Sequence, residues 1–250
     1  MLYSLHVSEV LLHKYLHHGL SSQAMAFNLI GPLIVRNDYE PIRTLLASRN
    51  LPWPAGDITG RFEAEDRSVF NENYGQPTSL DVAITGDDGP GIYIESKFTE
   101  TGFGGCSVYS AGDCDGRNPL HEPSLCYLDH IGRSYWRRLR EHGLEGLAQG
   151  PICPMTLYYQ FFREMLFALH MGGSFILLHD KRNPSFSVDG PHGNRGSFSF
   201  LIEQLPDHCH NRMGSISVQE VAASIRKCGG HDDWIGEFEA KYGLNGTGNA

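Results

Sequence analysis

The sequence predicts an α/β fold in which a central mixed β-sheet is flanked by α-helices. Two short apolar runs flank the turn sequence GDDGP (residues 86–90), which is typical of a β-hairpin. Segments with apolar residues at helical spacing lie on both sides of this hairpin along the chain. Strands mixed with such segments favour a sheet that is covered by helices.

The composition is that of an ordinary globular protein. The chain has 250 residues, of which 40% are hydrophobic and 20% are charged. We therefore expect one domain over residues 1–250, with an irregular insert rich in Cys and Gly at about 102–123. No apolar run approaches the roughly 18 residues of a membrane span, and the N-terminus lacks the features of a signal peptide. We expect a cytoplasmic protein without a membrane partner.

The charge is acidic overall but unevenly distributed. A net charge of −9 counts against a broad basic face that holds nucleic acid by counterion release. A local basic strip on an acidic body is still compatible with DNA binding. The residues that would form it are Arg133, Arg137, Arg138, Arg140, Lys181, Arg182 and Arg195.

In chain order, the first expected elements are helices. Residues 5–16 (LHVSEVLLHKYL) and 21–33 (SSQAMAFNLIGPL) both have helical periodicity. Ser21 or Ser22 is expected to cap the second helix, and Gly31-Pro32 is expected to end it.

The expected strands follow a loop-rich stretch. Residues 48–78 contain several prolines and glycines, which predicts loops, but GRFEAE (60–65) is compatible with a short strand. LDVAIT (80–85) and GIYIESKFT (91–99) then form the hairpin, whose loop is too long for a two-residue turn.

The second half of the chain is predicted to contain both element types. Residues 124–147 have apolar side chains at helical spacing and predict a long amphipathic helix. A second helix is expected over 154–173, begun by Pro154 and ended by Gly172. The remaining predictions are strands at 174–180 (SFILLHD) and 197–205 (SFSFLIEQL), and helices at 217–230 and 232–244.

The hairpin carries the residues that indicate chemistry. Side chains alternate along a strand, so Glu95 and Lys97 share one face with Tyr93. The other face is apolar and is expected to point into the core, which places Glu95 and Lys97 on the opposite side, near Asp81 of the partner strand. Two carboxylates on adjacent strands repel each other unless a hard cation such as Mg²⁺ neutralises them. Such a site activates a water and stabilises charge on a phosphate, and a nearby ammonium can orient or deprotonate that water.

Asp81 followed by Glu95-Ser96-Lys97, on a hairpin preceded by a helix, resembles the D-x(n)-E-x-K signature of the PD-(D/E)XK nuclease superfamily. The signature is short, but an ordered set of further segments resembles a bacterial branch of restriction-endonuclease-like proteins. Together these segments cover about residues 20 to 185. They are SSQAMAFNLIGPL, RFEAE, ESKFTE, YYQFFREMLFA and ILLHDKRNP.

The resemblance implies a restriction-endonuclease-like core and an enzyme that uses Mg²⁺ or Mn²⁺. It implies hydrolysis of DNA phosphodiester bonds by a metal-activated water, which leaves a 3′-hydroxyl and a 5′-phosphate. Asp81, Glu95 and the backbone carbonyl of Ser96 are implied as metal ligands, and Lys97 as the catalytic lysine. A homodimer is a further implication, because duplex-cutting enzymes of this fold often dimerise.

Two more site residues follow from the resemblance. Glu63 in RFEAE matches an upstream acid that often completes such sites. Gln160, with Arg163 one helical turn later, matches a Gln-bearing helix beside the active site. The sequence departs from the usual pattern in that no proline precedes Asp81.

Each of these assignments has a structural alternative. Glu95 and Lys97 could form an exposed pair worth under about 1 kcal/mol. Gln160 could cap a core edge, and Glu63 could be a loop charge like Glu65. The whole chain could be a catalytically silent nuclease fold that binds nucleic acid or protein, or an enzyme of another class that uses thiols or zinc.

Four cysteines flank the hairpin and the predicted long helix. Thiols in this position are similar to the iron–sulfur ligands of some DNA-processing nucleases. Their spacing, however, lacks the Cys-x-x-Cys pattern typical of zinc sites, which favours reduced thiols in a cytosolic chain over an iron–sulfur cluster or zinc. The four residues are Cys106, Cys114, Cys126 and Cys153.

Overall fold

The computed structural model describes residues 19–187 and 196–244, so the helix expected at 5–16 lies outside the described residues. Five strands form one sheet in the order β1-β2-β3-β4-β5. Strand β2 runs antiparallel to β1 and to β3, and β4 and β5 continue the sheet parallel to β3. The α/β class with a mixed sheet is thus confirmed. The strands are β1 (Thr59–Glu65), β2 (Ser79–Thr85), β3 (Ile92–Lys97), β4 (Ser174–His179) and β5 (Met213–Ser217).

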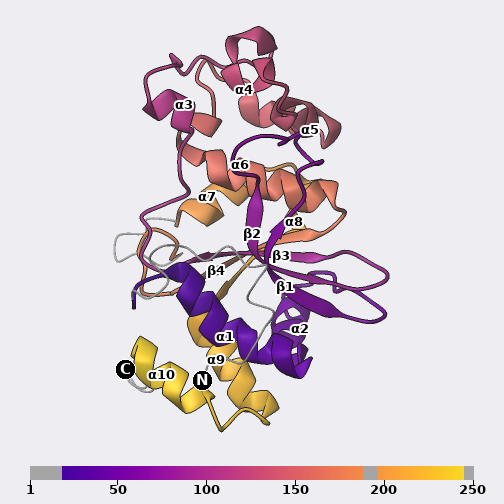
Figure 1. Cartoon of the computed structure of the whole chain (residues 1–250), viewed down its shortest axis with the longest axis vertical. Helices are drawn as coiled ribbons and strands as arrows, with labels where there is room; N and C mark the ends of the chain where they lie inside the picture. The colour runs from indigo at the N-terminus through magenta and orange to yellow at the C-terminus, as the bar shows by residue number, and fades with distance from the viewer. Residues whose placement is uncertain (1–18, 188–195, 245–250) are drawn as a thin grey trace.

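Helices cover both faces of the sheet (Figure 1). On one face, Ile92 and Ile94 of β3 belong to a core shared with α1 (Ser22–Arg36) and α9 (Val218–Cys228). On the other face, Tyr93 packs in a second core. That core is built around α6 (Met155–His170), with α7 (Ser197–Glu203) and α8 (Asp207–His210). The face of β3 that carries Glu95 and Lys97 is therefore covered by α6 and not left open.

Helix α1 begins as predicted but ends later. Ser21 is its N-cap, and its hydroxyl accepts a hydrogen bond from the Ala24 N–H at 3.3 Å. The predicted stop at Gly31-Pro32 is wrong, because the helix continues to Arg36 and ends at Asn37, which has a φ of 52°. Proline removes one backbone donor, but the helix on both sides of it buries apolar residues against the sheet. This packing outweighs the loss.

The long helix predicted over residues 124–147 is wrong. Gly132 and Gly143 have φ values of 84° and 67°, in the left-handed region that ends a helix. The stretch consists instead of η2 (Pro123–Leu125), α4 (Tyr127–His130), α5 (Tyr135–Glu141) and η3 (Glu145–Ala148). Together with α3 (Ser107–Ser110) in the irregular insert, α4 and α5 lie on the far side of α6 from the sheet (Figure 1).

The strand predicted at 197–205 is also wrong, because these residues form helix α7. The alternation Ser-Phe-Ser-Phe imitates a strand, but the side chains that are buried are Phe198 and Leu201, three residues apart, while Phe200 is 47% exposed. The fifth strand is the short β5, which the sequence did not indicate. In the part of the chain that the structure describes, no helix is both long and apolar enough to cross a bilayer.

Most of the remaining elements agree with the sequence. Strands β1 to β4 and helix α6 lie where the sequence predicts them. Helix α9 begins with a capping box, in which Ser217 and Glu220 bond each other's backbone N–H groups. Helix α10 (Ile235–Tyr242) also lies where a helix is expected, whereas α2 (Glu40–Ala47) is a helix that the sequence did not indicate. Both complete the layer around α1 and α9.

Candidate active site

Asp81 and Glu95 face each other across β2 and β3. The paired register of these strands ends at Val82 opposite Ile94, so Asp81 and Glu95 occupy the next positions on the same face. Beyond that point a side-chain hydrogen bond takes the place of the backbone hydrogen bonds between the two strands: the Ser96 N–H donates to Asp81 Oδ2 at 2.7 Å. The strand ends therefore hold two carboxylates close together, as the hairpin predicts.

Lys97, Glu95 and Gln160 form a closed hydrogen-bonded set. Lys97 Nζ donates to Glu95 Oε1 at 2.6 Å and to Gln160 Oε1 at 2.9 Å. Gln160 Nε2, on α6, donates to the same Glu95 oxygen at 2.7 Å. Glu95 and Lys97 are only 4% and 5% exposed, so the alternative of an exposed surface pair is wrong. Gln160 contacts the site and does not merely cap a core edge.

The electrostatics of the set keep Lys97 charged. Burial by itself would lower the pKa of Lys97, but the negative charges of Glu95, Glu164 and Asp81 raise that pKa above its usual value. The opposite holds for Asp81, because burial and then the charge of Glu95 raise its pKa well above normal. The site thus holds one ammonium among more carboxyl groups than it can neutralise.

Glu164 is a fourth acid of the site that the sequence did not reveal. It lies one helical turn after Gln160 and is 0% exposed. Neither of its carboxylate oxygens accepts a hydrogen bond of ordinary geometry from the described residues, although the Gln160 side chain lies near enough to lower its pKa. Burial and then the charge of Glu95 raise that pKa well above normal. The signal was present in YYQFFREMLFA, where Glu164 follows Gln160 at the helical spacing of four residues.

Glu63 is brought to the site by an unusual backbone conformation. It has a φ of 49°, a left-handed conformation that is uncommon for residues other than glycine, and it interrupts the pairing of β1 with β2. Its carboxylate accepts hydrogen bonds from Gln23 Nε2 at 2.5 Å and from Ser79 Oγ at 3.1 Å. Its competitor Glu65 is exposed and lies 3.9 Å from Arg67. Glu63 is therefore the upstream acid next to Asp81, whose pKa it helps to raise.

Helix α1 and Arg163 of α6 complete the surroundings of the site. Ser96 Oγ donates to the Ser22 carbonyl at 3.4 Å, so the first turn of α1 lies beside β3. Gln23, in the same turn, is a site neighbour that nothing in the sequence singled out. Arg163 does not join the hydrogen-bonded set, because its guanidinium lies over the Tyr159 ring at 5.2 Å.

A groove opens where β3 and β4 end. It has a volume of about 350 Å³ and is lined in part by Phe98, Glu100, Arg182 and Asn183. Asn183 Nδ2 donates to the carbonyls of Phe98 and Glu100 at 3.1 and 2.9 Å, which joins ESKFTE to HDKRNP. Two of the segments that carry the family resemblance thus meet directly after Lys97.

The carboxylates fit a hard divalent cation. Among the described residues, no three His, Cys, Asp or Glu side chains converge closely enough to hold a metal ion by themselves. Mg²⁺, however, commonly takes only one or two carboxylates and completes its shell with waters and substrate phosphate. Asp81, Glu95 and the Ser96 carbonyl would supply such a set. The hydrogen bond from the Ser96 N–H to Asp81 Oδ2 at 2.7 Å is the observation that supports it, because it holds the Asp81 carboxylate beside the backbone of Ser96 and next to Glu95.

A comparison with protein families gives a match over most of the sequence. A family model described as "Restriction Endonuclease associating with ARP" matches residues 3–243, which is nearly the whole chain. No curated protein and no solved structure matches the chain.

Proposed function

Because the chain belongs to this restriction-endonuclease family, we propose that it is a metal-dependent nuclease that hydrolyses DNA phosphodiester bonds. The observation that carries the proposal is the buried set of Lys97, Glu95 and Gln160 beside Asp81. Burying an ammonium and several carboxylates is costly for stability. A fold retains such a group most readily when its chemistry is used.

Each residue has a role in this reaction. Asp81, Glu95 and the Ser96 carbonyl would hold Mg²⁺ or Mn²⁺, which when bound polarises the scissile phosphate and acidifies a water. Lys97 is an ammonium at neutral pH, so it donates a hydrogen bond to a phosphate oxygen and stabilises the developing negative charge. This role differs from that of a base, because a raised pKa disfavours proton uptake from water at neutral pH.

Two residues position the reacting groups. Gln160 bonds both Glu95 and Lys97, so it fixes the direction of the carboxylate and of the ammonium together. Glu63 faces Asp81 from β1 and is itself fixed by Gln23 and Ser79. Preorganisation of this kind lowers the reorganisation needed when the transition state forms.

The test is cleavage of supercoiled and linear duplex DNA by the purified chain with Mg²⁺, with Mn²⁺ and with EDTA. We expect cleavage that requires the metal and leaves 5′-phosphate ends. Asp81→Asn and Lys97→Met should lower the rate at least ~100-fold, the typical effect of removing one group that stabilises the transition state.

Glu72→Gln is the matched control. Glu72 is a buried carboxylate that accepts hydrogen bonds from Thr78 and Tyr135 instead of facing the site, so its substitution should leave cleavage unchanged. Cleavage that survives in Lys97→Met, or that continues in EDTA, contradicts the proposal. Mg²⁺ binding without cleavage of duplex, single-stranded or branched DNA or of RNA would indicate a silent binding module instead.

A further inference from the structure

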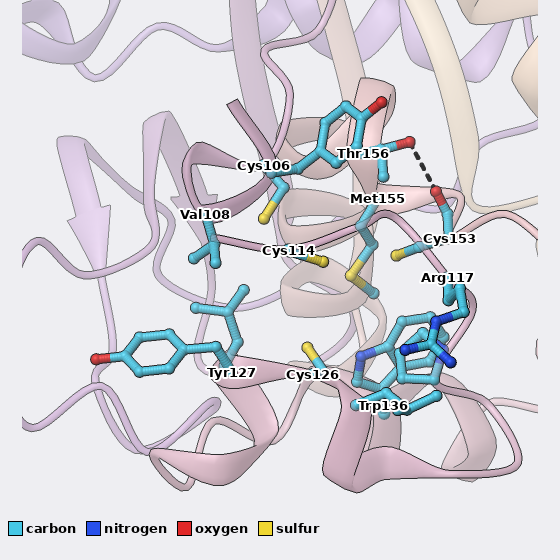
Figure 2. Close-up of a pocket in the computed structure, with 14 residues that line it drawn as sticks. Cys106, Val108, Cys114, Arg117, Cys126, Tyr127, Trp136, Cys153, Met155 and Thr156 are labelled. Carbon is cyan, nitrogen blue, oxygen red and sulfur yellow. Dashed lines mark hydrogen bonds between the residues drawn. The ribbon is translucent and has the colours of Figure 1, made fainter. Parts of the chain in front are cut away.

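Four cysteine side chains from separate loop segments meet in one pocket. Cys106 precedes α3, Cys114 follows it, Cys126 lies between η2 and α4, and Cys153 precedes α6. All four are free thiols. Figure 2 shows their sulfur atoms turned toward a common space, with the thioether of Met155 among them. The other two of the six cysteines, at positions 209 and 228, do not line this pocket.

The walls of the pocket suit thiolates bound to a metal. Apart from the sulfurs, the lining is mainly apolar and aromatic, and Arg117 adds a positive charge. The Gly116 N–H donates to Cys114 Sγ at 3.4 Å, and the Met155 backbone N–H is directed at the Cys153 sulfur. Hydrogen bonds to sulfur and a shell of low polarity are the features by which proteins stabilise thiolate-ligated metals.

The thiols influence one another and would repel each other as anions. Like charges confined to one small pocket repel each other, so four thiolates there would need a strongly positive centre. Cysteines packed as simple apolar residues have no need to gather in this way.

The distances among the four sulfurs favour an iron–sulfur cluster over a single zinc ion. Zinc requires four sulfurs within about 2.3 Å of one point. Among the described residues, no three cysteines or other ligands converge in that way. An iron–sulfur cluster has its irons at separate positions and takes one thiolate on each, so its ligands do not need a common centre.

We propose that Cys106, Cys114, Cys126 and Cys153 ligate a 4Fe–4S cluster. Iron and sulfide come from outside the chain, and each thiol releases its proton as its sulfur binds an iron, so the oxidation state of the cysteine sulfur does not change. The free volume of the pocket is about 20 Å³, which is room for about one water. Binding of the cluster would therefore require the four loop segments to lie slightly further apart and the flexible Met155 side chain to adopt another rotamer.

The cluster would stabilise the end of α6 that serves the candidate active site. In a regular helix the Gln160 N–H would donate to the Thr156 carbonyl. Here it donates to the Gly104 carbonyl at 3.0 Å, and the Thr156 carbonyl accepts from the Cys106 N–H at 3.1 Å. The backbone of residues 104–106 thus takes the place of one hydrogen bond within the first turns of α6. Ordering this segment fixes the backbone of Gln160.

The experiment is metal analysis of the full chain purified without oxygen. We expect about four irons and four acid-labile sulfides per chain, as a 4Fe–4S cluster requires. We also expect broad visible absorption that bleaches on reduction. Cys114→Ser and Cys126→Ser are the informative variants, because these residues are only partly buried and the fold should tolerate the change. Each should lose most of the iron and sulfide.

Cys228→Ser, at an exposed site, and Cys209→Ala, at a buried one, are the controls and should keep the full iron content. Oxidative removal of the cluster from the unaltered chain should free four further thiols for alkylation, and this result does not depend on variants that fold. A colourless chain without iron and sulfide overturns the proposal, as does one zinc ion per chain without sulfide. Neither outcome depends on DNA cleavage.

Discussion

Replacement of Lys97 by methionine tests the buried ion pair on which the candidate site depends. Methionine keeps most of the side-chain volume and removes the charge. At the 2.6 Å separation of Lys97 Nζ and Glu95 Oε1, Coulomb's law with an effective dielectric constant of about 20 gives about 6 kcal/mol of attraction. The cost of burying both charges offsets part of this. We therefore expect Lys97→Met to lower the free energy of unfolding by about 3–5 kcal/mol.

The assay is urea unfolding at neutral pH without divalent cations, followed by circular dichroism. Lys97→Met, Glu95→Gln and the double variant form a double-mutant cycle. The double variant should be less destabilised than the sum of the single variants, because it leaves neither charge without its partner. The destabilisation by Lys97→Met should also shrink at acidic pH, since protonation neutralises the carboxylates that lose their counter-charge.

Two results would refute this reasoning. One is a loss below about 1 kcal/mol in both single variants, which is the behaviour of exposed pairs. The other is additivity within about 0.5 kcal/mol, which would show that the two side chains act independently.

Three further predictions concern the surroundings of this pair. Because the folded-state pKa of Asp81 is raised, its ionisation destabilises the fold as pH rises above the unfolded value of 3.8. Metal-free Asp81→Asn should therefore be more stable than the unaltered chain in urea unfolding at pH 7. Mg²⁺ at a hundred times its dissociation constant should raise the free energy of unfolding of the unaltered chain by about 2.7 kcal/mol, and the Asp81→Asn variant should lack this stabilisation. An equal effect of Mg²⁺ on both proteins counts against the metal site. Glu63→Gly should be more stable than Glu63→Ala by about 1 kcal/mol, because glycine adopts the left-handed φ without strain; the reverse order of urea midpoints would contradict this. Gly105→Ala should lower the melting temperature and weaken cleavage, because a Cβ there would overlap the Thr156 carbonyl at the start of α6; Gly102→Ala, which meets no atom within 4 Å, is the control.

The sequence by itself determined the elements whose signals are local. The alternation in residues 91–99 and the turn at 86–90 specified the hairpin, and with it the convergence of Asp81, Glu95 and Lys97. The apolar period between Pro154 and Gly172 specified α6. These signals depend on the alternation of strand side chains and on the backbone limits of proline and glycine, which act over a few residues.

Other features depend on the tertiary packing of helices and loops against the sheet. Residues 197–205 alternate like a strand, yet they form a helix because burying Phe198 and Leu201 on one face fills the core above the sheet. The burial of Lys97 could not be inferred from β3, since it results from the position of α6. Gathering of the four thiols from residues 106–153 likewise depends on the path of irregular loops. Residues that are distant in sequence come together because the buried faces of helices, strands and loops pack against each other. No pattern within a short stretch of sequence encodes that packing.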